Sequence, residues 1–195
     1  MKKTTILALA IAAILVIASA EPTMAYVLLS PRRTWASTPV NVPVYNVGNS
    51  TINDGSGGVV AVSGAIKAWG VVTSSATSQA AVRGQAPATI TLNSNGHICT
   101  GSCLAATLTG YYSGSRINDA DVYTNTKYKY TSSKETDGCS GEYDIDGIMV
   151  HEVGHVIGIG HSNVAGSTMY PTVSSCNFNN RTLEADDLAA KNDLY

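Results

Sequence analysis

Hydrophobic residues recur at two different spacings along the chain. In residues 58–72 they stand three or four positions apart, which predicts a helix with one buried face. In residues 40–47 they alternate with polar residues, which predicts a strand, and Pro43 indicates that this strand lies near the edge of a sheet. Three more strand-like segments, separated by Gly, Ser and Asn, are residues 88–93, 104–111 and 120–130.

Two further helices are predicted in the last quarter of the chain. Residues 145–157 form the first, for which Asp144 or Asp146 is a suitable N-cap. Residues 182–194 form the second, with its acidic residues in the first turns. The order of helix, strands, helix and helix, without a repeat or a linker, predicts a single α+β domain in which helices pack on a sheet.

The first twenty residues have the pattern of an export signal. Two lysines precede an apolar run over residues 6–18, and small residues follow at Ala18 and Ala20. The run is shorter than the roughly 18 residues that a membrane-spanning helix needs. We therefore expect residues 1–20 to be cleaved, with an alternative cut after Ala25, which leaves residues 21–195 as a secreted domain without stable membrane association.

Composition narrows the range of partners. Of the 195 residues only 13% are charged, and the formal net charge is −2. A nucleic-acid-binding surface would need clustered Lys and Arg, so no nucleic-acid partner is expected. The sequence is consistent with an exported monomer.

Four cysteines, Cys99, Cys103, Cys139 and Cys176, remain after the signal. An even number in an exported chain favours two disulfides, for which three connectivities exist. Pairing of neighbours would give Cys99–Cys103 and Cys139–Cys176, and the second would stabilise the fold by about 4 kcal/mol in the chain-entropy model. The alternative is a metal site formed by His97 with Cys99 and Cys103.

The residues with the clearest chemical role lie between positions 151 and 161. On a helix, His151 and His155 share one face, so both can direct a ring nitrogen at one ion. Glu152 is rotated by about 100° from His151 and can approach the open side of that ion without binding it. Gly158 suits a left-handed turn that ends the helix and brings His161 in as third ligand.

Three imidazoles and an open fourth position are typical of catalytic zinc. Zinc lowers the pKa of its bound water and polarises a carbonyl group, while Glu152 would act as general base and later protonate the leaving amine. The expected reaction is hydrolysis of a peptide bond, with Glu152 as the catalytic residue.

The extended histidine motif, followed by Met169, resembles the signature of the metzincins. Within that class the chain most resembles the matrixins, of the secreted bacterial type, through Ser162, Met169-Tyr170-Pro171 and residues 183–188. The resemblance implies a zinc metalloendopeptidase with a twisted mixed sheet, an active-site helix, a backing helix and a C-terminal helix. It also implies that a protein or peptide substrate lies extended along an edge strand within residues 102–109.

The resemblance also assigns roles around the zinc. Met169, in a turn that we call the Met-turn (residues 167–171), would pack beneath the metal. Of the paired aspartates, one would be tied to the Met-turn, and Asp187 would receive the ammonium group of the trimmed N-terminus. The alternative is that Asp186 and Asp187 are solvated carboxylates in the first turn of a helix.

The chain also departs from the matrixin pattern. No free cysteine and no room for a prodomain are expected between the signal and Tyr26, and His97 alone remains for the second, structural zinc of animal matrixins. Calcium bound through Asp119, Asp121 or Asp144 stays open, although solvated or capping carboxylates are favoured. Two other functions also stay open: a non-catalytic zinc-binding or adhesion module, and hydrolysis of a non-protein amide.

Overall fold

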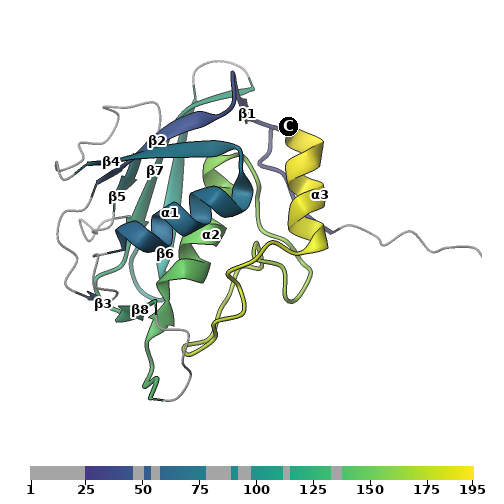
Figure 1. Cartoon of the computed structure of the whole chain (residues 1–195). Coiled ribbons are helices and arrows are strands. Elements are labelled where there is room, and N and C mark those ends of the chain that lie inside the picture. Colours follow the sequence, from purple (N-terminus) through teal and green to yellow (C-terminus); the bar gives the residue numbers. More distant parts are fainter. Residues whose placement is uncertain are drawn as a thin grey trace, which may run out of the picture.

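A computed structural model describes residues 25–45, 51–53, 58–77, 89–91, 98–111, 115–132 and 138–195. The expected signal at residues 1–20 and His97 lie outside these ranges. The described part has the expected α+β architecture, with three helices arranged around a mixed sheet (Figure 1). The helices are α1 (Val59–Trp69), α2 (Ile145–Val156) and α3 (Ala185–Leu194).

The main sheet has one antiparallel strand at its edge, while its other strand pairs are parallel. β7, the neighbour of that edge strand, pairs on one side with β6, and on the other side with β1 at Ile117 and with β5 at Asp121. β5 continues to β2 and β2 to β4. The bounds are β1 (Thr34–Trp35), β2 (Val40–Tyr45), β4 (Val72–Thr77), β5 (Thr89–Thr91), β6 (Ala105–Tyr111) and β7 (Arg116–Thr124).

A second, smaller sheet joins three two-residue strands, which are all parallel. They are β3 (Ile52–Asn53), β8 (Tyr130–Thr131) and β9 (Tyr143–Asp144). β9 leads directly into α2, so this sheet fixes the point at which the active-site helix begins.

The strand with Pro43 is second from the β4 edge of the main sheet. β5 pairs only with Val44 and Tyr45 of β2, so in the described structure Pro43 itself has a strand partner on the β4 side alone. Because a proline has no N–H to donate, it fits a strand position that pairs with a neighbouring strand on one side only.

α1 and α2 pack side by side against the sheet, as Figure 1 shows. Two tryptophans, both buried, bond to the backbone of α2. Trp69 at the end of α1 donates its indole N–H to the carbonyl of Val150, and Trp35 of β1 donates to that of Val156, both at 2.7 Å. Because these bonds satisfy polar groups inside the core, they fix where α2 lies relative to α1 and the sheet.

The predicted extent of one strand was wrong. The expected strand 120–130 is in fact β7, which starts at Arg116 and ends at Thr124, followed by a turn and then β8. Asn125 ends β7, because its side chain accepts a bond from the N–H of Lys127 and donates to the carbonyl of Cys103. Such asparagine turns compete with a strand ladder.

Both disulfides between neighbouring cysteines are formed. Cys99 is joined to Cys103, and Cys139 is joined to Cys176 across 37 positions of sequence. The pairing confirms the favoured connectivity and takes the sulfurs of Cys99 and Cys103 away from the alternative metal site with His97. Cys139–Cys176 ties the segment before β9 to the segment after the Met-turn.

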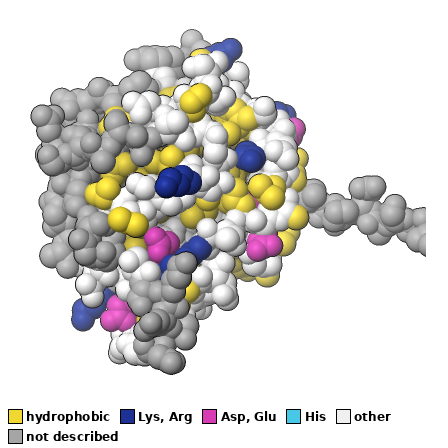
Figure 2. Space-filling model, in the orientation of Figure 1, with side chains coloured by type: hydrophobic (Ala, Val, Ile, Leu, Met, Phe, Trp, Pro, Cys, Tyr) yellow, Lys and Arg dark blue, Asp and Glu magenta, His cyan; other side chains and the backbone are white. Residues whose placement is uncertain are grey.

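The surface shows no gathering of positive charge on the face that Figure 2 displays. Among the described residues on this face, Lys and Arg side chains lie apart from one another, and several of them lie beside Asp or Glu. Among the residues that the structure describes, no helix combines the length and apolar character needed to cross a bilayer.

Candidate metal centre and active-site groove

The start of α2 is held by one carboxylate. Of the two suitable N-caps, the structure uses Asp144, which accepts bonds from the N–H groups of Asp146 and Gly147. Arg181 binds both oxygens of Asp144, at 2.7 and 2.8 Å, and also pairs with Asp146 at 3.1 Å. Because Asp144 is buried and paired in this way, its carboxylate is a capping group and not a solvated one.

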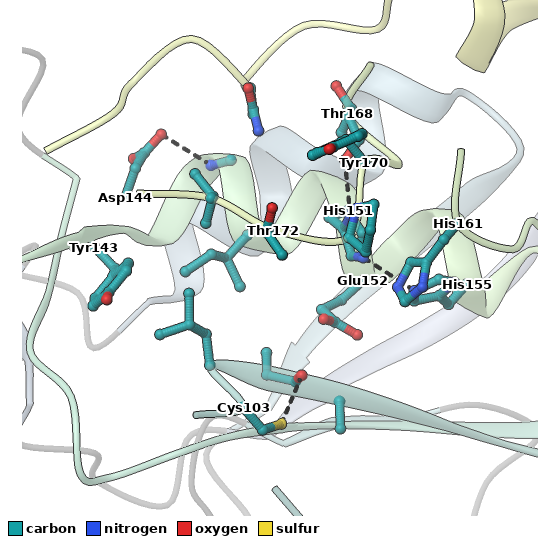
Figure 3. Close-up of a pocket in the computed structure, with 18 of the residues that line it drawn as sticks. Cys103, Tyr143, Asp144, His151, Glu152, His155, His161, Thr168, Tyr170 and Thr172 are labelled. Carbon is teal, nitrogen blue, oxygen red and sulfur yellow. Dashed lines mark hydrogen bonds between the residues drawn. The ribbon is translucent and has the colours of Figure 1, made fainter. Parts of the chain in front are cut away.

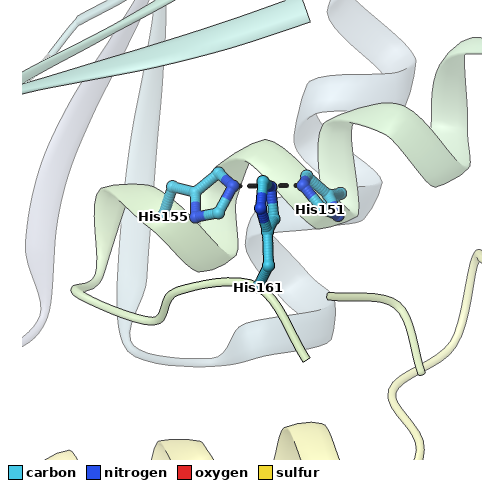
Figure 4. A group of neighbouring side chains, drawn as sticks. All are labelled: His151, His155 and His161. Carbon is cyan, nitrogen blue, oxygen red and sulfur yellow. Dashed lines mark hydrogen bonds between the residues drawn. The ribbon is translucent and has the colours of Figure 1, made fainter. Parts of the chain in front are cut away.

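α2 and the segment after it bring three histidines together. The rings of His151, His155 and His161 have centroids between 4.7 and 5.2 Å apart. One nitrogen from each ring belongs to a group whose members all lie within 4.8 Å of one another (Figure 4). The helical spacing places His151 and His155 on one face, and the turn after the helix returns His161 to the same face.

Two of the rings are oriented by backbone carbonyls. Nδ1 of His151 lies 2.7 Å from the carbonyl oxygen of Thr168, and Nδ1 of His155 lies 2.7 Å from that of Ile159. A carbonyl only accepts, so each Nδ1 carries the hydrogen and each Nε2 is left with its lone pair. The two Nε2 atoms lie 3.1 Å apart. Converging neutral Nε2 atoms with oriented rings fit a zinc ion.

The turn that returns His161 depends on Gly158. Its φ is 102°, a left-handed value that favours glycine, and a Cβ here would meet the carbonyl oxygen of Arg33 at 2.3 Å. The N–H of Gly158 bonds to the carbonyl of His155, which closes the last turn. The N-terminal segment then pairs with this turn, since Gly160 donates to the carbonyl of Val27.

Glu152 is 5% exposed and points from α2 into the space between the histidines and β6 (Figure 3). Its Oε2 accepts a hydrogen bond of 2.6 Å from the hydroxyl of Thr107 on β6. Burial raises the pKa of the Glu152 carboxyl, while His151 and the Thr107 hydroxyl act in the opposite direction. A buried carboxylate with a raised pKa is well suited to take up and release a proton.

Two of the histidines, His155 and His161, have lowered pKa values. Burial, with help from the charges of His151 and His161, lowers the pKa of His155 to about 3. Burial also lowers the pKa of His161, and His151 adds to that shift. Neutral imidazole is the form that binds a metal ion.

The Met-turn lies against α2. Met169 is 1% exposed, and a Cβ on Gly154 would come within 2.3 Å of its sulfur. Asp187 holds this turn, because its carboxylate accepts bonds from the N–H groups of Thr168 and Met169 and from the hydroxyl of Ser167. Thr168 in turn supplies the carbonyl that orients His151.

In this structure Asp187 binds the Met-turn, and its expected pairing with the ammonium group of a trimmed N-terminus stays a prediction. The carboxylate next to the N-terminal segment is that of Asp186, whose Oδ1 accepts a bond of 3.0 Å from the backbone N–H of Ala25. Its Oδ2 accepts a bond of 2.6 Å from Ser162, the residue after the third histidine. Both aspartates are buried, so the alternative of two solvated carboxylates is wrong.

A groove of about 480 Å³ runs past the histidines (Figure 3). One wall is β6, which among the described strands pairs only with β7 and therefore leaves its other edge open. The opposite wall is the segment after the Met-turn. Residues that line the groove beyond the histidines and Glu152 include Leu104, Ala105, Thr107, Tyr143, Gly147, Ile148, Tyr170, Val173, Asn177 and Asn180.

Two contacts at the site were not predicted from the sequence. Thr107 lies 45 positions from its partner Glu152, and Arg181 lies 37 positions from its partner Asp144. Neither contact belongs to a local sequence motif. Asp119 and Asp121, considered for calcium, lie on β7, and among the described residues neither joins a group of three potential metal ligands.

Four features together define a zinc-peptidase domain of the metzincin class. They are a mixed sheet with an open edge, an active-site helix with two histidines, a third histidine after a glycine turn, and a buried methionine turn. A family model described as matrixin, of the M10 peptidases, matches residues 45–195. The chain therefore belongs to the matrixin family, which is a family of zinc metalloendopeptidases.

Shorter segments match individual matrixins. The chain is 40% identical over 52 residues to Metalloendoproteinase 4-MMP of Arabidopsis thaliana, a match covering 27% of this chain and 15% of that protein. It is 38% identical over 60 residues to Matrilysin of Rattus norvegicus, covering 31% and 22%. It is 42% identical over 52 residues to Karilysin of Tannerella forsythia, covering 27% and 10%. The chain thus spans less than a quarter of these relatives.

Proposed function

We propose that this chain is an active zinc-dependent endopeptidase in which His151, His155 and His161 hold one zinc ion. The observation that carries the proposal is the group of three imidazole nitrogens within 4.8 Å of one another, with the buried carboxylate of Glu152 beside it in an open groove. Oriented neutral imidazoles are the ligand set of catalytic zinc, and a structural site would be closed by a fourth protein ligand.

Different residues of the chain would carry out different parts of peptide hydrolysis. His151, His155 and His161 would hold the zinc ion, which would supply a Lewis acid for the scissile carbonyl and the attacking water. Glu152 would take a proton from the attacking water as the water oxygen bonds to the scissile carbonyl carbon. It would then deliver that proton to the amide nitrogen as the C–N bond breaks, which releases an amine on one product and leaves a carboxylate on the other. Asp187 would keep His151 in place through Thr168, whose N–H it binds and whose carbonyl orients that ring.

The open edge of β6 would bind the substrate. An extended peptide can add to an exposed strand through main-chain hydrogen bonds, and side chains at alternate positions then point into the groove. The groove lies between β6 and the segment that contains Val173 and Asn177, so its walls would select the substrate side chain. We therefore expect protein or peptide substrates to be bound in an extended conformation.

Replacement of Glu152 by glutamine tests the mechanism. The Glu152→Gln variant should keep zinc, since Glu152 is not a ligand, and should lose roughly a hundredfold to ten-thousandfold in kcat/KM on a peptide library. Asp193→Asn, an equally conservative change of an exposed carboxylate near the end of α3 and outside the groove, should behave as wild type. Zinc would be measured by elemental analysis, and hydrolysis with and without a chelator.

The outcomes separate the candidate functions. Zinc binding without any hydrolysis by the wild-type protein would favour the non-catalytic zinc-binding or adhesion module. Hydrolysis of amides other than peptides, with peptides left intact, would keep the chemistry and change the substrate. His155→Ala should release zinc, whereas replacement of the fourth histidine, His97→Ala, should leave one zinc per chain.

We further propose that residues 1–20 direct export and that residues 21–195 form the exported catalytic domain. The two disulfides are compatible with an oxidising compartment. Mass spectrometry of the secreted protein would identify its first residue, with Glu21 and Tyr26 as the starts that follow from the two expected cuts.

A further inference from the structure

Thr107 makes an uncommon contact for a residue of a substrate-binding edge strand. Its hydroxyl Oγ1 lies 2.6 Å from Oε2 of Glu152 and 3.1 Å from the backbone carbonyl oxygen of the same residue. Thr107 is half-buried in β6, opposite Val122 of β7, and it lines the groove. The side chain therefore bridges the edge strand and the carboxylate of α2.

A threonine hydroxyl has only one hydrogen to donate. Both nearby oxygens of Glu152 are acceptors, and a charge-assisted bond to a carboxylate is the shorter and stronger of the two. The hydrogen therefore lies on the 2.6 Å contact with Oε2. This contact restrains one oxygen of Glu152 toward β6, so that the carboxylate has one preferred orientation within the groove.

The orientation of Glu152 would otherwise be weakly determined. A glutamate side chain has three rotatable bonds, and holding it in one arrangement costs up to about 2 kcal/mol of conformational entropy. A general base works only within hydrogen-bond reach of the proton that it accepts. A carboxylate that moves among several positions would therefore make catalysis less efficient. The Thr107 hydroxyl is the side-chain donor that the structure places on Glu152.

We propose that Thr107 is a positioning residue for Glu152: its hydroxyl fixes Oε2 and presents Oε1 to the water that attacks the substrate. This inference rests on the proposed endopeptidase function. It assigns to β6 a second role besides substrate binding, because the same strand that aligns the peptide also aligns the base. The backbone pairing of β6 does not depend on the hydroxyl, so the two roles can be separated by mutation.

The test compares two replacements of Thr107 with one replacement of a control threonine. Thr107→Val keeps the shape and the β-branch but removes the donor, and it should lower kcat by about 10-fold to 100-fold with KM within about twofold. Thr107→Ser restores the donor and should recover most of that loss. Thr73→Val, at an exposed position of β4 far from the groove, is the matched control and should have wild-type kcat and KM.

A double-mutant cycle measures the coupling between Thr107 and Glu152 in kcat, which a purely structural role of Thr107 would not produce. In a Glu152→Gln background, Thr107→Val should lower kcat by no more than about twofold further, because the group that Thr107 positions has been removed. A merely structural role would give the same loss in both backgrounds. Equal losses in the two backgrounds, or a rise in KM with kcat unchanged, would overturn the proposal.

Crystal structures supply a readout that does not need activity. In Thr107→Val the carboxylate of Glu152 should leave the wild-type position or occupy more than one, while zinc content stays at the wild-type level. In Thr107→Ser it should stay. A carboxylate that keeps one wild-type position in Thr107→Val would overturn the inference. If the wild-type protein cleaves no peptide, the proposed function fails, and the crystal structures still decide whether Thr107 orients Glu152.

Discussion

Gly154 stands where α2 comes closest to both α1 and the Met-turn. A Cβ at this position would lie 2.3 Å from the sulfur of Met169 and 2.8 Å from a ring carbon of Trp69, and both of these side chains are buried. Gly154→Ala should therefore overpack the core beneath the histidines and cost about 1–3 kcal/mol. Thermal unfolding of the zinc-loaded variant should show a Tm lowered by roughly 4–10 °C.

Gly64 provides the matched control in α1. It is exposed, and a Cβ there would meet nothing within 4 Å. Gly64→Ala should raise the stability by about 0.5–1 kcal/mol, because glycine inside a helix has a large conformational entropy to lose. If the two substitutions shifted Tm in the same direction, close packing at Gly154 would not be the cause.

His155 makes the stability of the metal-free protein depend on pH. Its pKa in the fold is about 3, well below the ordinary value of 6.5, so the unfolded state binds the proton more readily. The stability contribution is fully present above pH 6.5 and is lost as the pH falls toward 3. Between pH 7 and pH 5 the free energy of unfolding should decrease by up to about 2 kcal/mol through this residue.

Urea unfolding of chelator-treated protein at the two pH values measures this effect. The decrease should be smaller in His155→Gln, which cannot take up the proton. Glu152 changes the free energy of unfolding in the opposite direction, because its raised pKa lets the folded state bind a proton more readily than the unfolded state as the pH falls. Glu152 is present in both proteins, so its contribution cancels in the comparison. The same pH dependence in both proteins would contradict the assignment to His155.

The sequence predicted residues that act within one helical segment and missed those that act between segments. The spacing of His151 and His155 follows from the 3.6-residue period, so it can be recognised locally. The bond between Thr107 and Glu152 depends on how β6 lies against α2, which no local pattern states. Asp187 and not Asp186 binds the Met-turn, since adjacent helical residues point about 100° apart and the helix start decides which of them faces that turn.

At the scale of elements, all three expected helices are present, but the first ends at Trp69, and Val72, which was expected within it, begins β4. α2 begins and ends within one residue of the expected helix, because its N-cap and its glycine turn mark both ends. α3 begins at Ala185, three residues later than expected. The two-residue strands β1, β3, β8 and β9 are defined by the strands with which they pair, because two residues are too few for a hydrophobic pattern. β4 is rich in small polar residues, so its sequence does not indicate a strand either.

The two disulfides should contribute unequally to stability. In the chain-entropy model the bond Cys139–Cys176, with a separation of 37, contributes about 4 kcal/mol, and Cys99–Cys103, with a separation of 4, about 2 kcal/mol. Replacing both cysteines of each pair by serine and measuring urea unfolding tests this order. An equal or larger loss from the shorter pair would contradict it.

The longer disulfide should also affect the groove. Cys176 precedes Asn177, and its N–H bonds to the carbonyl of Glu142, so the bond holds the wall of the groove against the segment that leads into α2. The Cys139→Ser/Cys176→Ser variant should have a KM raised severalfold with zinc content unchanged, because the rings of His151 and His155 are oriented by backbone carbonyls and not by the disulfide. Peptide hydrolysis at several substrate concentrations would separate KM from kcat.

At the scale of the whole molecule, the N-terminal segment and the C-terminal helix both pack against the turn that carries His161. Leu29 donates to the carbonyl of Gly158, and Gly160 donates to that of Val27. On the other side of the same turn, Asp186 of α3 bonds to Ser162 and to the N–H of Ala25. The position of the third histidine therefore depends on residues from both ends of the described structure.

This arrangement predicts that the first residue of the protein affects its stability. A version that begins at Ala25 places its ammonium group 3.0 Å from Oδ1 of Asp186, where a version that begins at Glu21 has a neutral amide. Because the carboxylate is only 5% exposed, the charged pair should raise the stability by about 1 kcal/mol and Tm by roughly 2–4 °C. A version that begins at Tyr26 lacks the nitrogen that makes this bond and should not gain.

Two aspartate variants identify the partner of that ammonium. Asp186→Asn should remove the difference in Tm between the versions that begin at Ala25 and at Glu21. Asp187→Asn should lower Tm in both versions, since it loosens the Met-turn, but should leave the difference between them. A difference that survives Asp186→Asn and disappears in Asp187→Asn would show that the terminus pairs with Asp187 in solution. Both measurements use zinc-loaded protein at low salt, where a partly buried ion pair is least screened.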